Sequence, residues 1–557
     1  MEIPNIMQYA LSNAAVHGGK ADKTAVLGRV LKEHPEMKKQ IKDVIAEIDK
    51  VIAKVNSLSI DEQTAQLGDK APELLQKQKP AKRELIELPD AQLGNVVTRL
   101  PPEPSKHLHI GHALSFTINY MYAQKYEGKC ILRYEDTNPA TAKKEFIDSM
   151  DEEIKHYLQI KPSETRIVSS DMQKFYDHAE QLIKIEKAYV CDCTKEQISE
   201  MRQKGELCEC RTRTSEEHMA DWNEMLKGKF DEGQKVLRLV GDIQSPNMVM
   251  RDPSIFRISK EIHHLHKHKY SVWPLYDFEN AVEDATTGVT HILRSIEFGE
   301  MRVELQDYIK KLLKLPIQTV VQYGRINISG SNSQGREIRE MINSGKYIGW
   351  DDPRLVTLTA LRKRGIQSET YRELAIEVGL SKTKTNLDFT VVSSINRKIL
   401  NDKTKRLFLI KEPVLIDIEG APEQEAEVKN HPTLDLGTRK YKVHSKFYIE
   451  KSDAENFEEG EIVRLMDCLN FKVHKGKYAY EHSEYEKFKG KGKKIIHWVP
   501  KEHSVEVHVM MPDAKKIKCK AETDVTKLKN EDIIQFTRFG FCRVEDIKGQ
   551  LFWYGHE

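Results

Sequence analysis

The chain of 557 residues has few cysteines, almost no net charge and no long apolar run. Eight cysteines cannot supply a disulfide scaffold for this length, so any clustering among them suggests a metal. A net charge of +2 excludes a global field for nucleic acid, which would need local basic patches. The apolar runs are too short to span a bilayer, and the first residues lack the layout of a signal peptide. We therefore expect a cytoplasmic protein without a membrane partner.

What is present is an ordinary soluble composition, with 39% hydrophobic and 31% charged residues. The length is too great for one core and indicates several domains. Residues 1–90 look helical, because apolar residues recur there at three- and four-residue spacing: Ile41, Val44, Ile48, Val51, Ile52 and Val55. A charged, proline-bearing linker follows near residues 76–83.

Residues 99–112 read RLPPEPSKHLHIGH and lie between a strand-like run and a helix-like run. Strand, tight loop and helix form the phosphate-facing corner of a doubly wound α/β sheet, where the helix N-terminus attracts anions. His109 and His112 add two donors, and Gly111 leaves room for a ligand to approach. Alone, the His-x-x-His spacing also fits a helix start with core histidines.

A second strand-like run, at residues 128–134, ends at Glu135. Ligands of doubly wound folds bind at the carboxyl ends of the strands, where a carboxylate suits an ammonium group. The alternative is a solvated acid at a strand end.

Two Cys-x-Cys pairs, Cys191 with Cys193 and Cys208 with Cys210, could surround one tetrahedral Zn²⁺. Such a zinc would be structural, because four thiolates leave no position for water. Four reduced thiols are the alternative. For the later histidines at 263, 264, 266 and 268 we favour a solvated or RNA-facing segment over a metal site.

The third candidate region spans residues 270–297. Tyr276 and Asn280 are four residues apart, so a helix would place them on one face. Arg294 ends an apolar run, and with the tyrosine and the amide it makes a fork that fits a carboxylate. A structural ion pair is the alternative for Arg294.

From about residue 401 the pattern changes to period two, most clearly at residues 504–510. Many short strands with lysine-rich turns are typical of β-barrels.

Residues 99–112 resemble the first signature of class I aminoacyl-tRNA synthetases, in the form of the glutamyl/glutaminyl branch. The segments around Glu135 and Tyr276 are similar to the amino-acid pocket of that branch. Lys106 departs from the pattern, because the family usually has glycine there. Residues 329–336 also depart, since they lack the Lys-Met-Ser-Lys-Ser-like second ATP loop; Arg325 or Arg336 could supply the missing cation.

The resemblance implies a multidomain α/β and β protein with a Rossmann-type catalytic domain. We expect these parts: a helical appendage (1–90), the first catalytic half (91–190), an inserted acceptor-end domain with the zinc site (191–270), the second catalytic half (271–330), a helical stem-contact region (331–400) and anticodon-binding β-barrels (401–557).

The same resemblance implies the roles of the site residues. His109 and His112 are the catalytic pair, which stabilises the transition state of adenylation. ATP would be bound by Glu103, Pro104, Ser105, His109, Ile110, Gly111, His112, Ser295, Arg325, Ile326 and Arg336. Glutamate would be bound by Arg99, Glu103, Glu135, Tyr276, Asn280 and Arg294.

The implied activity is that of an archaeal-type glutamate–tRNA ligase. It uses ATP with Mg²⁺ and L-glutamate, and it charges tRNA(Glu), with tRNA(Gln) left open. In this family tRNA must be bound before glutamate is activated. We expect a monomer. Arg294 decides for glutamate, because glutamine would leave a buried guanidinium unpaired. Two rivals remain: a glutaminyl-tRNA synthetase, and an inactive tRNA-binding relative suggested by residues 329–336.

Overall fold

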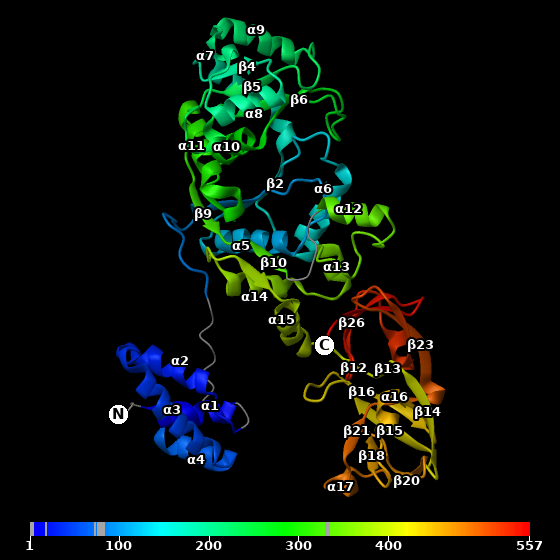
Figure 1. Ribbon diagram of the computed structural model, residues 1–557. Coiled ribbons are helices and arrows are strands. Elements are labelled where there is room, and N and C mark those ends of the chain that lie inside the picture. Colours follow the sequence, from blue (N-terminus) through cyan, green and yellow to red (C-terminus); the bar gives the residue numbers. More distant parts are fainter. Residues whose placement is uncertain (1–4, 17–18, 72–73, 75–83, 329–334) are drawn as a thin grey trace. The chain divides into compact units, whose positions relative to one another are not determined.

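The computed structural model describes residues 5–16, 19–71, 74, 84–328 and 335–557, which belong to two compact units, Met1–Glu84 and Leu85–Glu557. Figure 1 labels their helices and strands. The predicted linker at residues 76–83 lies outside the described residues. None of the described helices is long and apolar enough to cross a membrane.

The first unit is helical, as its apolar spacing predicts. It contains α1 (Ile6–Val16), α2 (Lys23–Glu33), a 3₁₀ helix (Pro35–Gln40), α3 (Ile41–Asn56) and α4 (Ile60–Lys70). On α3 the predicted stripe faces the core, where Val44, Ile48 and Val55 are fully buried. Ile41 at the start of α3 is exposed, so the stripe covers all but the first turn.

The second unit begins with a parallel sheet in the order β1-β2-β3. Its parts are β1 (Val97–Leu100), α5 (Ile110–Lys125), β2 (Lys129–Tyr134), α6 (Lys144–Asp151), a π-helical turn (Glu152–Tyr157) and β3 (Glu164–Ile167). A parallel pair from the second half, β8 (His291–Ser295) and β9 (Thr319–Tyr323), adjoins this sheet. The Thr290 amide donates to the Val97 carbonyl at 3.0 Å, so β8 runs beside β1.

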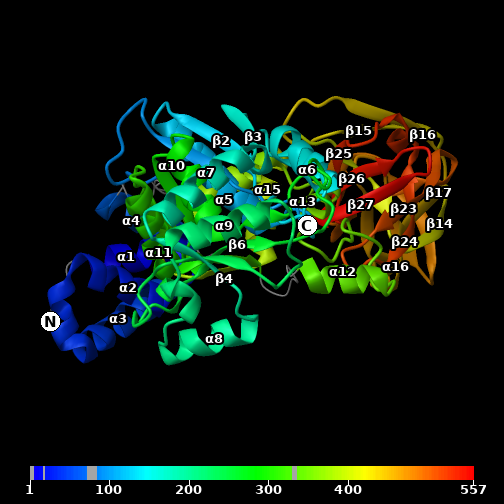
Figure 2. The ribbon, with the colours of Figure 1, turned by 90° about the horizontal axis from the view of Figure 1, so that it is seen from above.

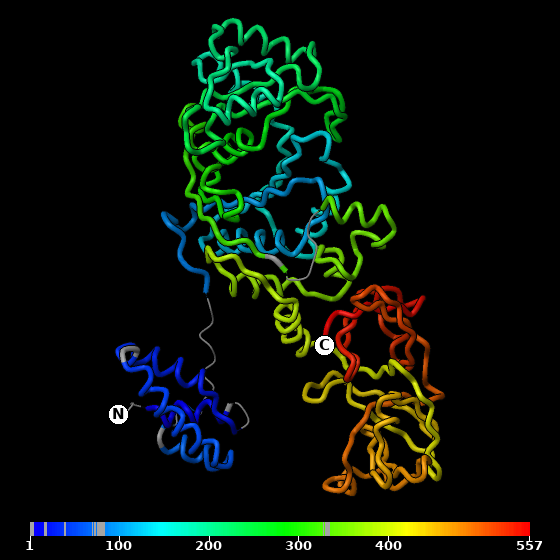
Figure 3. The backbone as a smooth tube through the Cα atoms, viewed as in Figure 1, coloured from blue at the N-terminus to red at the C-terminus, as the bar shows by residue number. Residues whose placement is uncertain are grey.

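An insertion, coloured from cyan-green to green in Figure 3, lies between the two halves of this sheet in the chain. Its antiparallel sheet has the order β4-β5-β6-β7. The elements are α7 (Met172–Lys184), β4 (Ala188–Cys191), α8 (Lys195–Lys204), α9 (Ser215–Leu226), β5 (Val236–Leu239), β6 (Ser254–Ile258) and β7 (Val272–Pro274). The strands β4 to β6 and the helices α8 and α9 gather in one lobe (Figures 1 and 2).

The second half continues with α10 (Tyr276–Thr286) and α11 (Gly299–Leu313), which pack together. The extended run over residues 319–328 is not one strand, because β10 (Ile326–Ile328) leaves β9 and pairs with β11 (Thr385–Leu387). Gly324 lies at the break, where a Cβ would come within 2.0 Å of the Thr383 carbonyl oxygen. Only glycine allows the chain to pass there.

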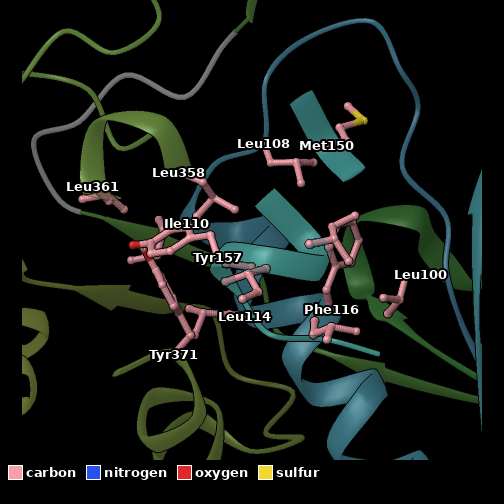
Figure 4. Close-up of a cluster of buried hydrophobic side chains, with 14 of the residues drawn as sticks. Leu100, Leu108, Ile110, Leu114, Phe116, Met150, Tyr157, Leu358, Leu361 and Tyr371 are labelled. Atoms are coloured by element: carbon pink, nitrogen blue, oxygen red, sulfur yellow. Dashed lines mark hydrogen bonds between the residues drawn. The ribbon is translucent and has the colours of Figure 1, made fainter. Parts of the chain in front are cut away.

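A helical region follows, with α12 (Gly335–Asn343), α13 (Leu358–Lys363), α14 (Ser368–Val378) and α15 (Phe389–Asn401). Its core includes the histidine motif: Leu108 and Ile110 share one hydrophobic cluster with Leu358 and Leu361 of α13 (Figure 4). The backbone joins them too, because the Ile110 amide donates to the Val356 carbonyl at 3.0 Å. The helical region therefore holds the loop between β1 and α5.

The C-terminal part is rich in β-structure, as predicted. One seven-stranded sheet has the order β12-β25-β26-β27-β23-β24-β13, and the other has the order β21-β18-β19-β20-β14-β17-β22. The strands of the first sheet are β12 (Arg406–Leu407), β25 (Ile533–Phe536), β26 (Gly540–Asp546), β27 (Leu551–His556), β23 (Ser504–Met510), β24 (Lys516–Glu522) and β13 (Leu409–Ile410).

The strands of the second sheet are β21 (Lys494–Ile496), β18 (Ile462–Leu465), β19 (Asn470–His474), β20 (Lys477–His482), β14 (Pro413–Glu419), β17 (Lys446–Glu450) and β22 (Val499–Pro500). A separate hairpin pairs β15 (Gln424–Lys429) with β16 (Thr438–Val443), and two short helices are α16 (Lys451–Glu455) and α17 (Tyr485–Phe488). Each seven-stranded sheet has its own hydrophobic core.

Strand β27 also contacts the helical region. The Arg364 guanidinium donates to the Gly555 carbonyl at 2.9 Å, and the Asn396 amide bonds to the His556 ring at 2.9 Å. The two backbones lie very close, because a Cβ on Gly555 would be 2.4 Å from the Arg364 carbonyl oxygen.

Candidate active site

The histidine pair opens helix α5, with His109 as its N-cap. The His109 Nδ1 accepts from the Gly111 amide at 3.1 Å, and the His112 Nδ1 accepts from the His109 amide at 3.2 Å. Both Nδ1 atoms are therefore acceptors, so each neutral ring carries its proton on Nε2. The ring centroids are 3.8 Å apart. The backbone thus prepares two neighbouring Nε2–H donors.

Burial keeps both rings neutral. It lowers the pKa of His109 to about 3, with Lys106 and Arg325 adding to the effect, and it holds the pKa of His112 well below its usual value. At neutral pH the pair therefore acts as hydrogen-bond donors and not as cations.

The histidines line a cavity of about 1250 Å³ that both halves of the catalytic sheet enclose. It brings together most of the predicted site residues: Arg99, Glu103, His109, Ile110, Gly111, His112, Glu135, Tyr276, Arg294, Ser295, Arg325 and Ile326. Four predicted residues do not line it: Pro104, Ser105, Asn280 and Arg336. Arg336 is on the surface, where it pairs with Glu340 at 3.1 Å.

The loop that departs from the family's second ATP signature, residues 329–336, is described only from Gly335, because residues 329–334 lie outside the described part of the chain. The other candidate cation, Arg325, does line the cavity and forms an ion pair with Glu297. Of the two arginines, Arg325 is therefore the one placed to meet a ligand.

A buried charge network lies beneath the part of the cavity that Arg99 and Glu135 line. Asp284 accepts from Arg99 Nε at 3.2 Å and from Arg133 Nη1 at 2.7 Å. Burial alone would raise the pKa of Asp284, but Arg133 and Arg99 hold it below its usual value. Arg133 Nη2 also donates to Glu135 at 2.8 Å and to Asn280 at 3.1 Å. Arg99, Arg133, Asp284 and Glu135 thus compensate one another's charges.

Arg294 is different, because it has no carboxylate partner among the described residues. Its Nη1 donates to the amide oxygen of Gln306 at 3.0 Å. Its Nε and Nη2 are buried and, within the described ranges, have no hydrogen-bond partner. Burial lowers the pKa of Arg294, which is the effect expected of an uncompensated cation. An anion could complete this group.

Three buried residues of this site were not predicted from the sequence: Arg133, Asp284 and Gln306. Arg133 interrupts an apolar strand two residues before Glu135, and a period of two places both on one face. Asp284 is four residues after Asn280 on α10, so these two share a face as well. Those two signals were present in the sequence, whereas nothing there indicated Gln306.

The four cysteines of the insertion lie together, with their sulfur atoms within 4.8 Å of one another. Cys208 Sγ is 3.7 Å from Cys191 Sγ and 3.4 Å from Cys193 Sγ. A tetrahedral Zn²⁺ with bonds of about 2.3 Å would space its sulfurs by about 3.8 Å. All four are free cysteines, and the spacing of their sulfur atoms fits a zinc ion.

The expectation of a solvated histidine segment at residues 263–268 is wrong for its first members. His263 is fully buried against Asp136, with Nε2 at 2.9 Å from the Asp136 carbonyl, and His264 bonds to the Asp136 carboxylate at 2.9 Å. The His263 Nδ1 faces the amides of Leu265 and His266 and must accept from them. Its proton is therefore on Nε2, which disfavours a metal there. These histidines instead hold the chain directly after β2 through their hydrogen bonds to Asp136.

The split parallel sheet, the histidine pair at a helix N-terminus and the cavity between the halves define a class I tRNA synthetase. Family models agree: residues 95–402 match the catalytic domain of class I tRNA synthetases (E and Q), and residues 404–489 and 495–545 match their anticodon-binding domains. The chain belongs to this family of class I tRNA synthetases for glutamate and glutamine, which confirms the resemblance seen in the sequence.

Curated relatives of similar length carry the name "Glutamate--tRNA ligase". That of Thermococcus kodakarensis is 38% identical over 98% of this chain and 97% of its own. Those of Pyrococcus abyssi and Nitrosopumilus maritimus are 38% and 37% identical, over 99% and 98% of this chain and 98% of each relative. Among solved structures, a glutamate tRNA ligase from Elizabethkingia meningosepticum covers 56% of this chain and 70% of its own, with a TM-score of 0.39 and 14% identity.

Proposed function

We propose that this chain ligates L-glutamate to tRNA(Glu), after activating glutamate with ATP to glutamyl-adenylate. The observation that carries the proposal is the buried guanidinium of Arg294, which lines the cavity and has no carboxylate partner among the described residues. A buried cation with free donors favours an acidic side chain over a neutral amide. The names of the relatives support the same choice.

In this proposal the γ-carboxylate of glutamate binds Arg294 and Arg99, beside Tyr276. The α-ammonium lies toward Glu135, whose carboxylate also lines the cavity. Asn280 does not line the cavity and would act indirectly, by accepting a hydrogen bond from Arg133 through its side-chain oxygen. The γ-carboxylate and the α-ammonium of the substrate thus meet groups of opposite sign at the two ends of one site, and the α-carboxylate stays free to react with ATP.

ATP, with Mg²⁺ on its phosphates, occupies the side of the cavity formed by the loop before α5. The Nε2–H groups of His109 and His112 stabilise the charge that develops on the α-phosphate, and Arg325 is the proposed additional cation. No protein nucleophile is required, because the α-carboxylate of glutamate attacks the α-phosphate of ATP and displaces pyrophosphate. Positioning and preorganised donors carry the reaction.

Zn²⁺ would be held by Cys191, Cys193, Cys208 and Cys210, and a zinc with four thiolates braces structure without taking part in the reaction. The insertion that carries these cysteines would pack against the acceptor end of the tRNA. The C-terminal sheets would read the anticodon, where splayed bases are recognised on their edges. Charging assays with purified tRNA(Glu) and tRNA(Gln) decide whether tRNA(Gln) is a second substrate.

The experiment is ATP–pyrophosphate exchange with tRNA present, comparing glutamate with glutamine. Wild type should prefer glutamate, and Arg294→Ala should raise the KM for glutamate about a hundred-fold, since a charge-assisted pair is lost. Arg294→Lys keeps the positive charge but loses the two-pronged guanidinium, so its KM for glutamate should lie between those of wild type and Arg294→Ala. Unchanged glutamate kinetics in Arg294→Ala would overturn the pocket. A preference for glutamine would identify a glutaminyl enzyme, and tRNA binding without exchange would identify an inactive relative.

A further inference from the structure

Three buried arginines surround the amino-acid end of the cavity, but they are not equivalent. Arg99 and Arg133 both have carboxylate partners. Arg294 has only Gln306 as a hydrogen-bond partner in the part of the chain that the structure describes. What holds Arg294 in place is therefore a neutral amide.

Gln306 is itself almost fully buried, at 2% exposure, on helix α11. Its amide nitrogen donates to Asp277 Oδ1 at 3.1 Å, while its amide oxygen accepts from Arg294. A flipped amide would set NH₂ against the guanidinium and oxygen against the carboxylate. Its two neighbours therefore determine the orientation of the amide.

The charge of Asp277 is compensated by Arg302, whose Nη1 donates to Asp277 Oδ2 at 2.5 Å. Arg302 also lies over the Tyr276 ring, 5.4 Å from its centroid, so this pair borders the same wall of the cavity. Gln306 thus stands between two ionic groups, Arg294 and the Asp277–Arg302 pair, and keeps the carboxylate from pairing with Arg294.

We infer that Gln306 is a positioning residue that sets the preference for an acidic amino acid, by anchoring Arg294 through a neutral acceptor. An anchoring carboxylate would hold the guanidinium equally well but would cancel its charge. The amide orients Arg294 and leaves its full charge uncompensated at the wall of the cavity, where the acidic side chain of the substrate would meet it. This inference rests on the proposed function and adds the residue that makes Arg294 selective.

Two variants separate anchoring from charge. Gln306→Met has a similar shape but no acceptor, and it should raise the KM for glutamate about tenfold with kcat changed little, because Arg294 is less well held. Gln306→Glu supplies a charged acceptor and should raise that KM about a hundred-fold. It should also reduce the ratio of kcat/KM for glutamate to that for glutamine by at least tenfold.

The ratio is the decisive readout, because both amino acids are compared on one preparation with tRNA and any unfolded fraction cancels. Gln40→Glu, the same chemical change at an exposed position of the N-terminal unit, is the matched control and should keep the wild-type ratio. A wild-type ratio in Gln306→Glu would overturn the inference. If Arg294→Ala still raised the KM for glutamate in that case, the proposed function would stand and only the role of Gln306 would be refuted. If Arg294→Ala had no effect either, the proposed glutamate pocket would be refuted as well.

Discussion

Arg133 Nη1 lies 2.7 Å from Asp284 Oδ1, and this contact joins β2 of the first catalytic half to α10 of the second. The two residues are 151 positions apart and both are fully buried. The same guanidinium holds Glu135, so one side chain fixes two carboxylates from opposite halves of the site.

Arg133→Met should therefore destabilise the catalytic domain by about 3–5 kcal/mol, because it leaves Asp284 and Glu135 as buried charges with one partner fewer. The measurement is the thermal unfolding midpoint. Arg133→Met combined with Asp284→Asn should recover part of the loss, since the stranded charge is removed. A double variant no more stable than the single variant would contradict this account.

His109→Asn should separate structure from chemistry. Asparagine is a good N-cap, so the start of α5 and the unfolding midpoint should be nearly unchanged. The Nε2–H donor is lost, and kcat for pyrophosphate exchange should fall about 10²- to 10³-fold. Because burial lowers the pKa of His109 to about 3, wild-type activity should show no histidine titration between pH 6 and 8. A strong inflection near pH 6.5 would count against neutral donors.

Metal analysis of the purified full chain should find about one zinc per molecule. Cys191→Ser should lose it and lower the unfolding midpoint, because the thiolates of β4 and the following turn are no longer held together. Two controls should keep the metal: Cys130→Ser, a buried thiol outside the cluster, and His264→Gln, in the histidine segment. Zinc absent from the wild type, or retained by Cys191→Ser, would refute the site.

The π-helical turn carries Glu153, whose carboxyl group accepts from the Thr359 hydroxyl at 2.7 Å. Burial raises its pKa from 4.5 to about 7. The pKa of Glu153 is higher in the folded protein than in the unfolded chain, so the protonated carboxyl group favours folding. This contribution to the free energy of unfolding is complete below pH 4.5 and is lost as the pH rises to about 7; in total it is roughly 3 kcal/mol. Glu153→Gln should therefore unfold at a higher temperature than wild type at pH 8, but not at pH 4.5. If the difference in unfolding temperature between Glu153→Gln and wild type were the same at pH 4.5 and pH 8, the effect would be excluded.

Local patterns allowed much of the architecture to be predicted. The strand–loop–helix corner at residues 99–112, the helix from Tyr276 and the period-two strands of the C-terminal part are all visible in short windows of sequence. The break between β9 and β10 is not, because it depends on the backbone of Thr383, which is distant in the chain.

The site shows the same limit. The family resemblance implied that Arg99 and Arg294 hold one carboxylate, and both residues line the cavity. Their different surroundings, Asp284 for one and Gln306 for the other, arise from tertiary contacts that a single sequence does not reveal. The prediction for the histidine segment was wrong for a related reason. Its composition suggested exposure to solvent, whereas His263 and His264 form hydrogen bonds with the carbonyl and the carboxylate of Asp136 in the interior.

The close approach of Gly555 to Arg364 leaves no room for a side chain where β27 meets the helical region. Any side chain at position 555 would act as a wedge between β27 and the end of α13, because its first carbon would meet a carbonyl oxygen at 2.4 Å. Such a wedge would act away from the cavity, which Gly555 does not line. It would instead loosen the attachment of the C-terminal β-structure to the helical region.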